Sequence, residues 1–280
     1  MNIIQLFSLL DLKNDQILEF SSEDYIRMEK KINFEKKVNP EIDSNTSENL
    51  ITALKDYKEE LLFVMSNLVL FNFLNHNNVS KNNVSNYNLT VSDEKIKEFI
   101  ALFLTDDLIS FFSLKLSKNS CNDLEELDAV LDLKRYFPEE IVYKMGLLLY
   151  SKLDFAIYQL NVSTTNEFSN IAYIKHSAFY DLLSHFATIE LDQKMVVLLN
   201  LVADNYEKMT NIVFFSSVIK SMASYNAFLE GISKLLIEGR EILMRPKEKK
   251  GDENDELFLV IKIISVIVFL LIAFHKLGYY

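Results

Sequence analysis

The chain of 280 residues contains 40 acidic and 29 basic residues, so its net charge at neutral pH is −11. Phosphate backbones and anionic lipid surfaces repel such a chain, which argues against nucleic acid as a partner. A single cysteine, Cys121, excludes an internal disulfide framework and is typical of a reducing compartment. Only five glycines and three prolines are available for hairpins or phosphate-binding loops, which favours helices.

Most of the chain has the pattern of capped amphipathic helices, with apolar residues at three- and four-residue steps. Ser22, Ser47 and Ser92 each stand where such a pattern begins, and Asn122 with Glu125 forms a capping-box pair before another. We therefore expect an all-α, multi-helix bundle of roughly nine or ten helices. The predicted helices span residues 22–37, 47–74, 92–104, 105–116, 124–136, 138–160, 167–188, 192–208, 211–221 and 225–244.

Composition favours one domain. Residues 1–244 are expected to form a single helical bundle, because no Pro- or Gly-rich linker divides them. The alternative is two bundles joined near 76–92, where a polar, Asn-rich stretch predicts an exposed or disordered loop. A charged linker, 245–256, then leads to an apolar segment, 257–274, and a short tail, 275–280.

The apolar segment 257–274 is interrupted only by Lys262 and Ser265. At about 1.5 Å per residue it spans about 27 Å, close to the hydrocarbon core of about 30 Å. Lys262 lies one turn inside the start, so its stem can carry the ammonium back to the headgroups. We predict one C-terminal transmembrane helix. The residues assigned to the membrane anchor are Leu257, Val260, Ile264, Val268, Leu271 and Phe274.

This segment has two alternative interpretations. An amphipathic helix lying flat on a membrane needs a polar face, and residues 263–274 offer only Ser265. A buried core helix is harder to set aside, because the rest of the chain is also rich in apolar runs. The charged linker 245–256 before the segment argues against that alternative.

Charges flanking the segment predict its orientation. Arg245, Lys247, Lys249 and Lys250 precede it, whereas Lys276 is the one lysine or arginine after it. Basic residues near a membrane span favour the cytoplasm. The chain is therefore expected to be a single-pass membrane protein with a cytoplasmic N-terminal domain. That domain carries a net charge of −13, since the chain from residue 257 onward holds two lysines and no acids.

Few residues have a pattern that predicts chemistry. The four histidines show no metal-ligand spacing, and no dinucleotide, P-loop, nucleophile-elbow or zinc-protease motif occurs, so no cofactor or metal is expected. Asp181 lies one helical turn before His185, and His176 lies nine residues upstream. A structural pair on a helix face is the simpler interpretation. A membrane-tethered enzyme with a site around these three residues is the alternative.

Tyrosines recur along the predicted helix 138–160, at Tyr143, Tyr150 and Tyr158. Aromatic side chains at helical spacing are usually core residues, so we interpret the three as core packing.

An apolar stripe in residues 1–12 is the candidate partner surface. Ile3, Ile4, Phe7 and Leu10 fall on one side of an amphipathic helix. A partner protein could bind this stripe. The alternative is that the stripe docks onto the protein's own bundle.

Two resemblances to known families concern this architecture. Residues 235–241, with Leu235 four residues before Gly239, resemble the death-motif helix of apoptosis regulators of the B-cell-lymphoma class, which are all-helical and C-terminally anchored. Arg240 stands where that motif has an acid, and the chain has no tryptophan for their Asn-Trp-Gly-Arg signature. The plan of a helical bundle with one C-terminal span also resembles the cytoplasmic anchoring subunit of type VI secretion systems.

These features predict a non-enzymatic, C-terminally membrane-anchored scaffold that presents a cytoplasmic helical bundle to partner proteins, such as a subunit of a membrane-associated machine. Its expected partners are proteins at the membrane and the lipid bilayer itself, not nucleic acid. The alternatives are a type VI secretion-like anchoring subunit, a pathogen or viral effector at a host membrane, and a membrane-tethered enzyme.

Overall fold

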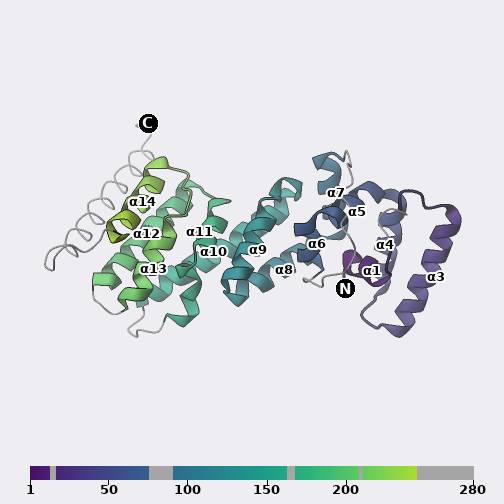
Figure 1. The fold of residues 1–280 in the computed structure, drawn as a ribbon, viewed down its shortest axis with the longest axis horizontal. Coiled ribbons are helices and arrows are strands. Elements are labelled where there is room, and N and C mark those ends of the chain that lie inside the picture. The colour runs from purple at the N-terminus through teal and green to yellow at the C-terminus, as the bar shows by residue number, and fades with distance from the viewer. Residues whose placement is uncertain (13–16, 76–90, 163–167, 208–210, 245–280) are drawn as a thin grey trace. The chain divides into compact units, whose positions relative to one another are not determined.

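The computed structural model describes residues 1–12, 17–75, 91–162, 168–207 and 211–244. Every regular element among these residues is a helix, so the all-α class is confirmed (Figure 1). The described residues form thirteen α-helices and two short 3-10 helices, more than the nine or ten expected. In chain order the first are α1 (Ile3–Leu9), α3 (Ser22–Val38), α4 (Ser44–Asp56), α5 (Lys58–Ser66), α6 (Leu68–Leu74), α7 (Asp93–Phe103), α8 (Thr105–Lys118), α9 (Cys121–Leu131) and η1 (Lys134–Tyr136). They are followed by α10 (Glu139–Val162), η2 (Ser169–Lys175), α11 (Ser177–Ser184), α12 (Ile189–Glu207), α13 (Ile212–Met222) and α14 (Glu230–Met244).

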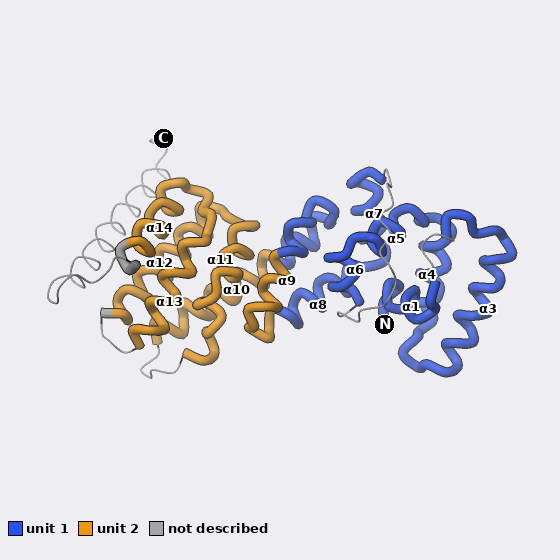
Figure 2. The backbone as a smooth tube through the Cα atoms, in the orientation of Figure 1, with its two compact units in different colours: residues 1–115, 129–145 blue, residues 116–128, 146–280 orange. Residues whose placement is uncertain are grey.

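Contacts between helices divide the chain into two compact units, which Figure 2 distinguishes by colour. Unit 1 contains the described residues of 1–115 and 129–145, and unit 2 contains 116–128 and the described residues from 146 onward. The division falls within α8, α9 and α10 and not at 76–92, the alternative boundary suggested by composition.

The extra helices in unit 1 arise where polar or irregular residues interrupt an apolar run. Residues 47–74 form parts of three helices and not one, with breaks at Tyr57 and Asn67. The Asn67 side chain accepts a hydrogen bond from the Leu70 amide at 3.1 Å and so begins α6. Asparagine competes with the helical backbone for such bonds, which is why a continuous apolar pattern did not give a continuous helix.

Caps also differ from those expected in unit 2. Helix α9 begins at Cys121 because Ser120 accepts the Asp123 amide at 3.1 Å, so the predicted Asn122–Glu125 capping box is wrong. The predicted helix 167–188 is divided into η2 and α11 at His176, whose backbone is extended. Helix α10, by contrast, is one continuous helix, as predicted.

Among the described residues of unit 2, Asp192 is the most deeply buried carboxylate, and it joins α12 to the loop before α14. Its side chain has no exposed surface. One oxygen accepts the Tyr225 hydroxyl at 2.7 Å and the Phe228 amide at 3.2 Å, and the other accepts the Leu229 amide at 2.8 Å. Burial and the bond to Asp192 raise the pKa of Tyr225 far above its ordinary value, so the phenol remains a donor.

The rest of that loop is held in the same way. The Asn226 amide donates to the Ser184 hydroxyl and the Ala227 amide to the Ser233 hydroxyl, both at 2.8 Å. Four consecutive backbone amides, from residue 226 to 229, therefore bind side-chain oxygens. The sequence pattern placed this segment inside a helix starting at 225, whereas α14 begins at Glu230.

In the part of the chain that the structure describes, no helix is both long and apolar enough to cross a membrane. The predicted anchor 257–274, the linker 245–256 and the tail 275–280 lie outside the described residues, as does most of the predicted loop 76–92. The transmembrane helix thus stays a prediction.

We expect Asp192→Asn to lower the free energy of unfolding by about 2 to 3 kcal/mol, because an amide nitrogen would face the Leu229 amide and leave a buried donor without an acceptor. Chemical denaturation followed by circular dichroism measures this. The matched control is Asp204→Asn, an exposed carboxylate on the same helix, expected within about 0.5 kcal/mol of the parent. Equal effects of the two substitutions would contradict the assigned role of Asp192.

Candidate functional site

The candidate partner stripe of α1 is buried within unit 1. Ile3, Ile4, Phe7 and Leu10 are each at most 1% exposed. Helix α1 packs against α4 and α6, so the apolar side of the helix faces the protein's own core.

Polar bonds hold α1 in this place. The side-chain amides of Asn2 and Gln5 both donate to the Leu74 carbonyl at the end of α6, at 3.0 and 3.1 Å. The Thr46 hydroxyl donates to the Met1 carbonyl at 2.9 Å. The stripe of α1 is therefore not an exposed surface in this structure. It docks onto the protein's own helices, which was the alternative interpretation. Periodicity could not decide between the two, because a helix face that binds a partner and one that binds the core have the same spacing.

A polar cluster in unit 2 contains two of the three residues considered for an enzyme site. His185, which follows α11, lies with its Nε2 atom 2.9 Å from Oδ1 of Asp128 on α9. Asp181, one turn earlier on α11, lies close enough to both groups to feel their charges. Burial raises the pKa of Asp181, the Asp128 carboxylate raises it further, and the Ser224 hydroxyl and His185 oppose the rise.

His176 does not join this cluster. Burial and the charge of Lys175 lower the pKa of His176. The carboxylate that opposes this shift is Glu125, a different acid of α9. The structure thus brings Asp181 and His185 together and adds Asp128. Asp128 was not among the residues predicted from the sequence, because it lies 57 residues from His185 in the chain and only folding brings the two together.

The hydroxyls beside the cluster bond to the backbone. Ser184 donates to the Tyr180 carbonyl at 2.8 Å and accepts the Asn226 amide. Ser224 donates to the carbonyls of Ser177 and Ser221, both at 3.0 Å. The cluster can bind and hold a proton, and its serines fasten the ends of α11 and α13. Among the described residues, no three His, Cys, Asp or Glu side chains are placed to hold a metal ion.

Helix α10 carries an exposed apolar stripe in unit 2. We use the name α10 stripe for Leu147, Phe155, Tyr158 and Val162, which are 42% to 59% exposed. They lie at steps of eight, three and four residues, so they share one side of the helix. The opposite side of α10 is its core face and is buried. That face includes Leu149, Leu153, Ala156 and Leu160.

The close packing of that core face fixes the orientation of α10. At Gly146 a Cβ atom would lie 2.9 Å from the Phe186 ring, so the absence of a side chain admits the ring. Tyr150 donates to the Phe186 carbonyl at 2.9 Å.

The prediction that the tyrosines of α10 are core residues is wrong for Tyr143 and Tyr158, which are 66% and 59% exposed. The sequence signal that could have predicted this exposed surface is that α10 has apolar residues on both of its sides.

No family model matches the chain, and neither do the curated proteins or the solved structures with which it was compared. The two family resemblances thus rest on architecture and on the residues already quoted.

We expect Asp181→Asn to be more stable than the parent near pH 7 by about a few tenths of a kcal/mol, the size usual for partly exposed charges. The raised pKa means that the folded state binds this proton more tightly than the unfolded state does. Stability from Asp181 is thus present at low pH and lost as the pH rises through the folded-state pKa.

The advantage of Asp181→Asn should therefore shrink as the pH falls below the ordinary carboxylate value of about 4. Thermal unfolding as a function of pH, with Asp204→Asn in parallel, measures the difference. An advantage that grows toward low pH would contradict the direction of the shift.

Proposed function

We propose that this protein is a non-enzymatic, C-terminally membrane-anchored scaffold, and that the α10 stripe is its contact with a partner protein. Monomeric surfaces seldom gather large apolar side chains in one row unless something binds there. The stripe runs over 16 residues, or about 22 Å of helix, which suits an apolar helix of a membrane-associated partner.

Anchoring is supported by the sequence of residues 257–274 and its basic approach, which favour a single-pass protein with a cytoplasmic helical part. The acidic balance of the chain disfavours nucleic acid as a partner. The non-enzymatic character is supported by the bonds of Asp192, Ser184 and Ser224, each of which binds backbone amides or carbonyls.

A membrane-tethered enzyme is the second candidate, favoured by the grouping of Asp128, Asp181 and His185. A histidine paired with one carboxylate and lying near another whose pKa is raised has the elements of a general acid–base site. Replacing His185 with asparagine distinguishes the candidates. A scaffold keeps its partner contact through α10 in this variant.

We expect a photo-crosslinking amino acid at position 158 of the full-length chain to capture one defined membrane-associated protein, because the Tyr158 ring lies in the α10 stripe. Phe155→Glu should abolish that crosslink by placing a charge in an apolar contact. The control is the same crosslinker at Val213, which is 79% exposed on α13 of the same unit. The same products from both positions, or a crosslink that survives Phe155→Glu, would count against the α10 stripe.

Removal of residues 257–280 should make the remaining chain extractable from membranes as a folded protein, because attachment that resists extraction depends on this segment. Extraction of membranes at alkaline pH measures it: the full-length chain stays in the pellet and the shortened chain appears in the supernatant. Protease added from the cytosolic side should cut near residues 245–250.

Aggregation of the shortened chain would instead mean that residues 257–274 are a core helix. A crosslink from position 158 to residues 257–274 of the same chain would show that this helix covers the α10 stripe.

A further inference from the structure

Helix α3 of unit 1 has an exposed face whose charge is opposite to that of the whole chain. Its buried side, which includes Met28 and Ile32, lies toward the core, and its contacts are chiefly with α4, beside which it runs in Figure 1. The exposed face carries four cations, one acid and three large apolar side chains. The cations are Arg27, Lys30, Lys31 and Lys37, the acid is Glu23, and the apolar residues are Ile26, Phe34 and Val38.

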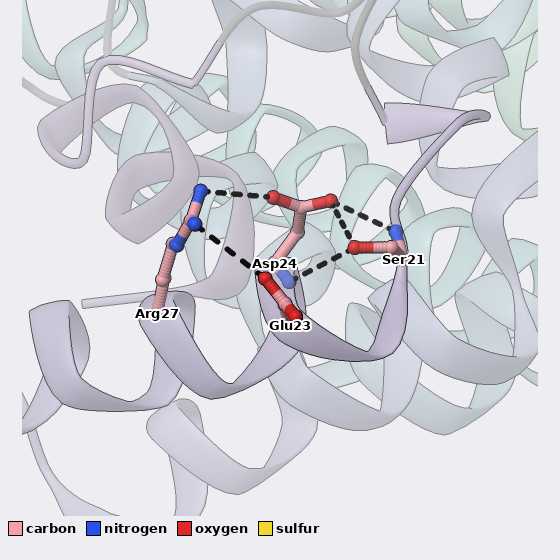
Figure 3. A network of polar contacts seen from close by, with 4 residues as sticks. All are labelled: Ser21, Glu23, Asp24 and Arg27. Carbon is pink, nitrogen blue, oxygen red and sulfur yellow. Dashed lines mark hydrogen bonds and ion pairs between the residues drawn. The ribbon is translucent and has the colours of Figure 1, made fainter.

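Part of this charge is compensated at the start of the helix, as Figure 3 shows. Arg27 lies 3.6 Å from Glu23 and 3.7 Å from Asp24. Asp24 also accepts the Ser21 amide and hydroxyl, and these bonds lower its pKa. Both acids stand in the first turn, where the helix dipole stabilises negative charge.

Farther along the helix the two acids, Glu29 and Glu35, are only partly exposed, and Glu29 is paired with Lys55 of α4 at 3.1 Å. Lys31 binds the Leu10 carbonyl, which leaves its charge in place. Lys30 and Lys37 have no hydrogen-bond or ion-pair partner among the described residues. They alternate along one side with Ile26 and Phe34, at steps of four, four and three residues.

The net charge of −11 does not cancel this local charge. At physiological ionic strength the screening length is about 8 Å, so a surface that touches α3 feels the lysines of that face and little of the acids elsewhere. Phe34 and Val38, each 65% exposed, can enter the headgroup region while the lysine stems extend toward phosphates.

We propose that the exposed face of α3 lies on an anionic lipid surface. The exposed convex side of one helix, with apolar and basic residues interleaved, suits a lipid surface. An acidic peptide would need a groove to bind in. This contact does not depend on residues 257–274. It would set the distance of unit 1 from the membrane.

The absence of tryptophan from the chain allows a local test. Phe34→Trp in the full-length protein places a single fluorophore on the α3 face. The protein is incorporated by detergent removal into phosphatidylcholine vesicles with or without phosphatidylserine. We expect a blue shift of emission, and quenching by brominated lipid, only with phosphatidylserine. Raising the salt to about 1 M, where the screening length is about 3 Å, should reverse the shift.

Adding Lys30→Gln and Lys37→Gln to Phe34→Trp should lower the ratio of membrane-bound to free α3 by about 30-fold, since each basic residue near an anionic surface contributes about a fivefold factor. Phe228→Trp, at an exposed phenylalanine of unit 2, is the matched control and should show no shift.

An unchanged Phe34→Trp spectrum, an equal shift at position 228, a shift that survives the lysine substitutions, or a response to polyglutamate in place of lipid would each overturn the proposal. Attachment through residues 257–274 would not need phosphatidylserine, so failure of the anchor and failure of the α3 contact give different results.

Discussion

The turn between α13 and α14 depends on one buried carboxylate. Asp192 has no exposed surface, and it accepts bonds from the Tyr225 hydroxyl and from the amides that precede α14. A buried charge is tolerated only when donors surround it, so the loop must take the path that delivers those donors. Asp192 thereby fixes how the chain turns before α14 and where α14 begins.

The same requirement explains most polar contacts in the described chain. Every helix leaves free amides at its start and free carbonyls at its end, and they need partners when they are buried. The side chains of Asn2 and Gln5 donate to the carbonyl at the end of α6, and that of Asn67 accepts an amide at its start. The Ser184 hydroxyl accepts the amide of residue 226. With few glycines and prolines available, polar side chains make the turns. This structural use of serine and asparagine is the main argument for a scaffold over an enzyme.

Two exposed surfaces of the described chain carry the proposed contacts, and each lies within one unit. The α10 stripe of unit 2 is apolar and suits a protein helix, whereas the α3 face of unit 1 combines apolar residues with uncompensated lysines. The difference lies in the charge around the apolar side chains. Net charge predicted repulsion from anionic lipid, but screening makes the local charge of α3 the quantity that matters.

The sequence by itself determined the all-α class, most helix ranges, and the cap at Ser92, because capping and amphipathic spacing are local properties. Only the tertiary structure decided which apolar face is buried. The stripe of Ile3, Ile4, Phe7 and Leu10 is covered, while Tyr158 and Phe155 are exposed, although both sets have helical spacing. It also decided the partners of Asp192 and His185, which lie 33 to 57 residues away. Periodicity indicates that a helix has an apolar side, but the neighbour that covers that side comes from distant parts of the chain.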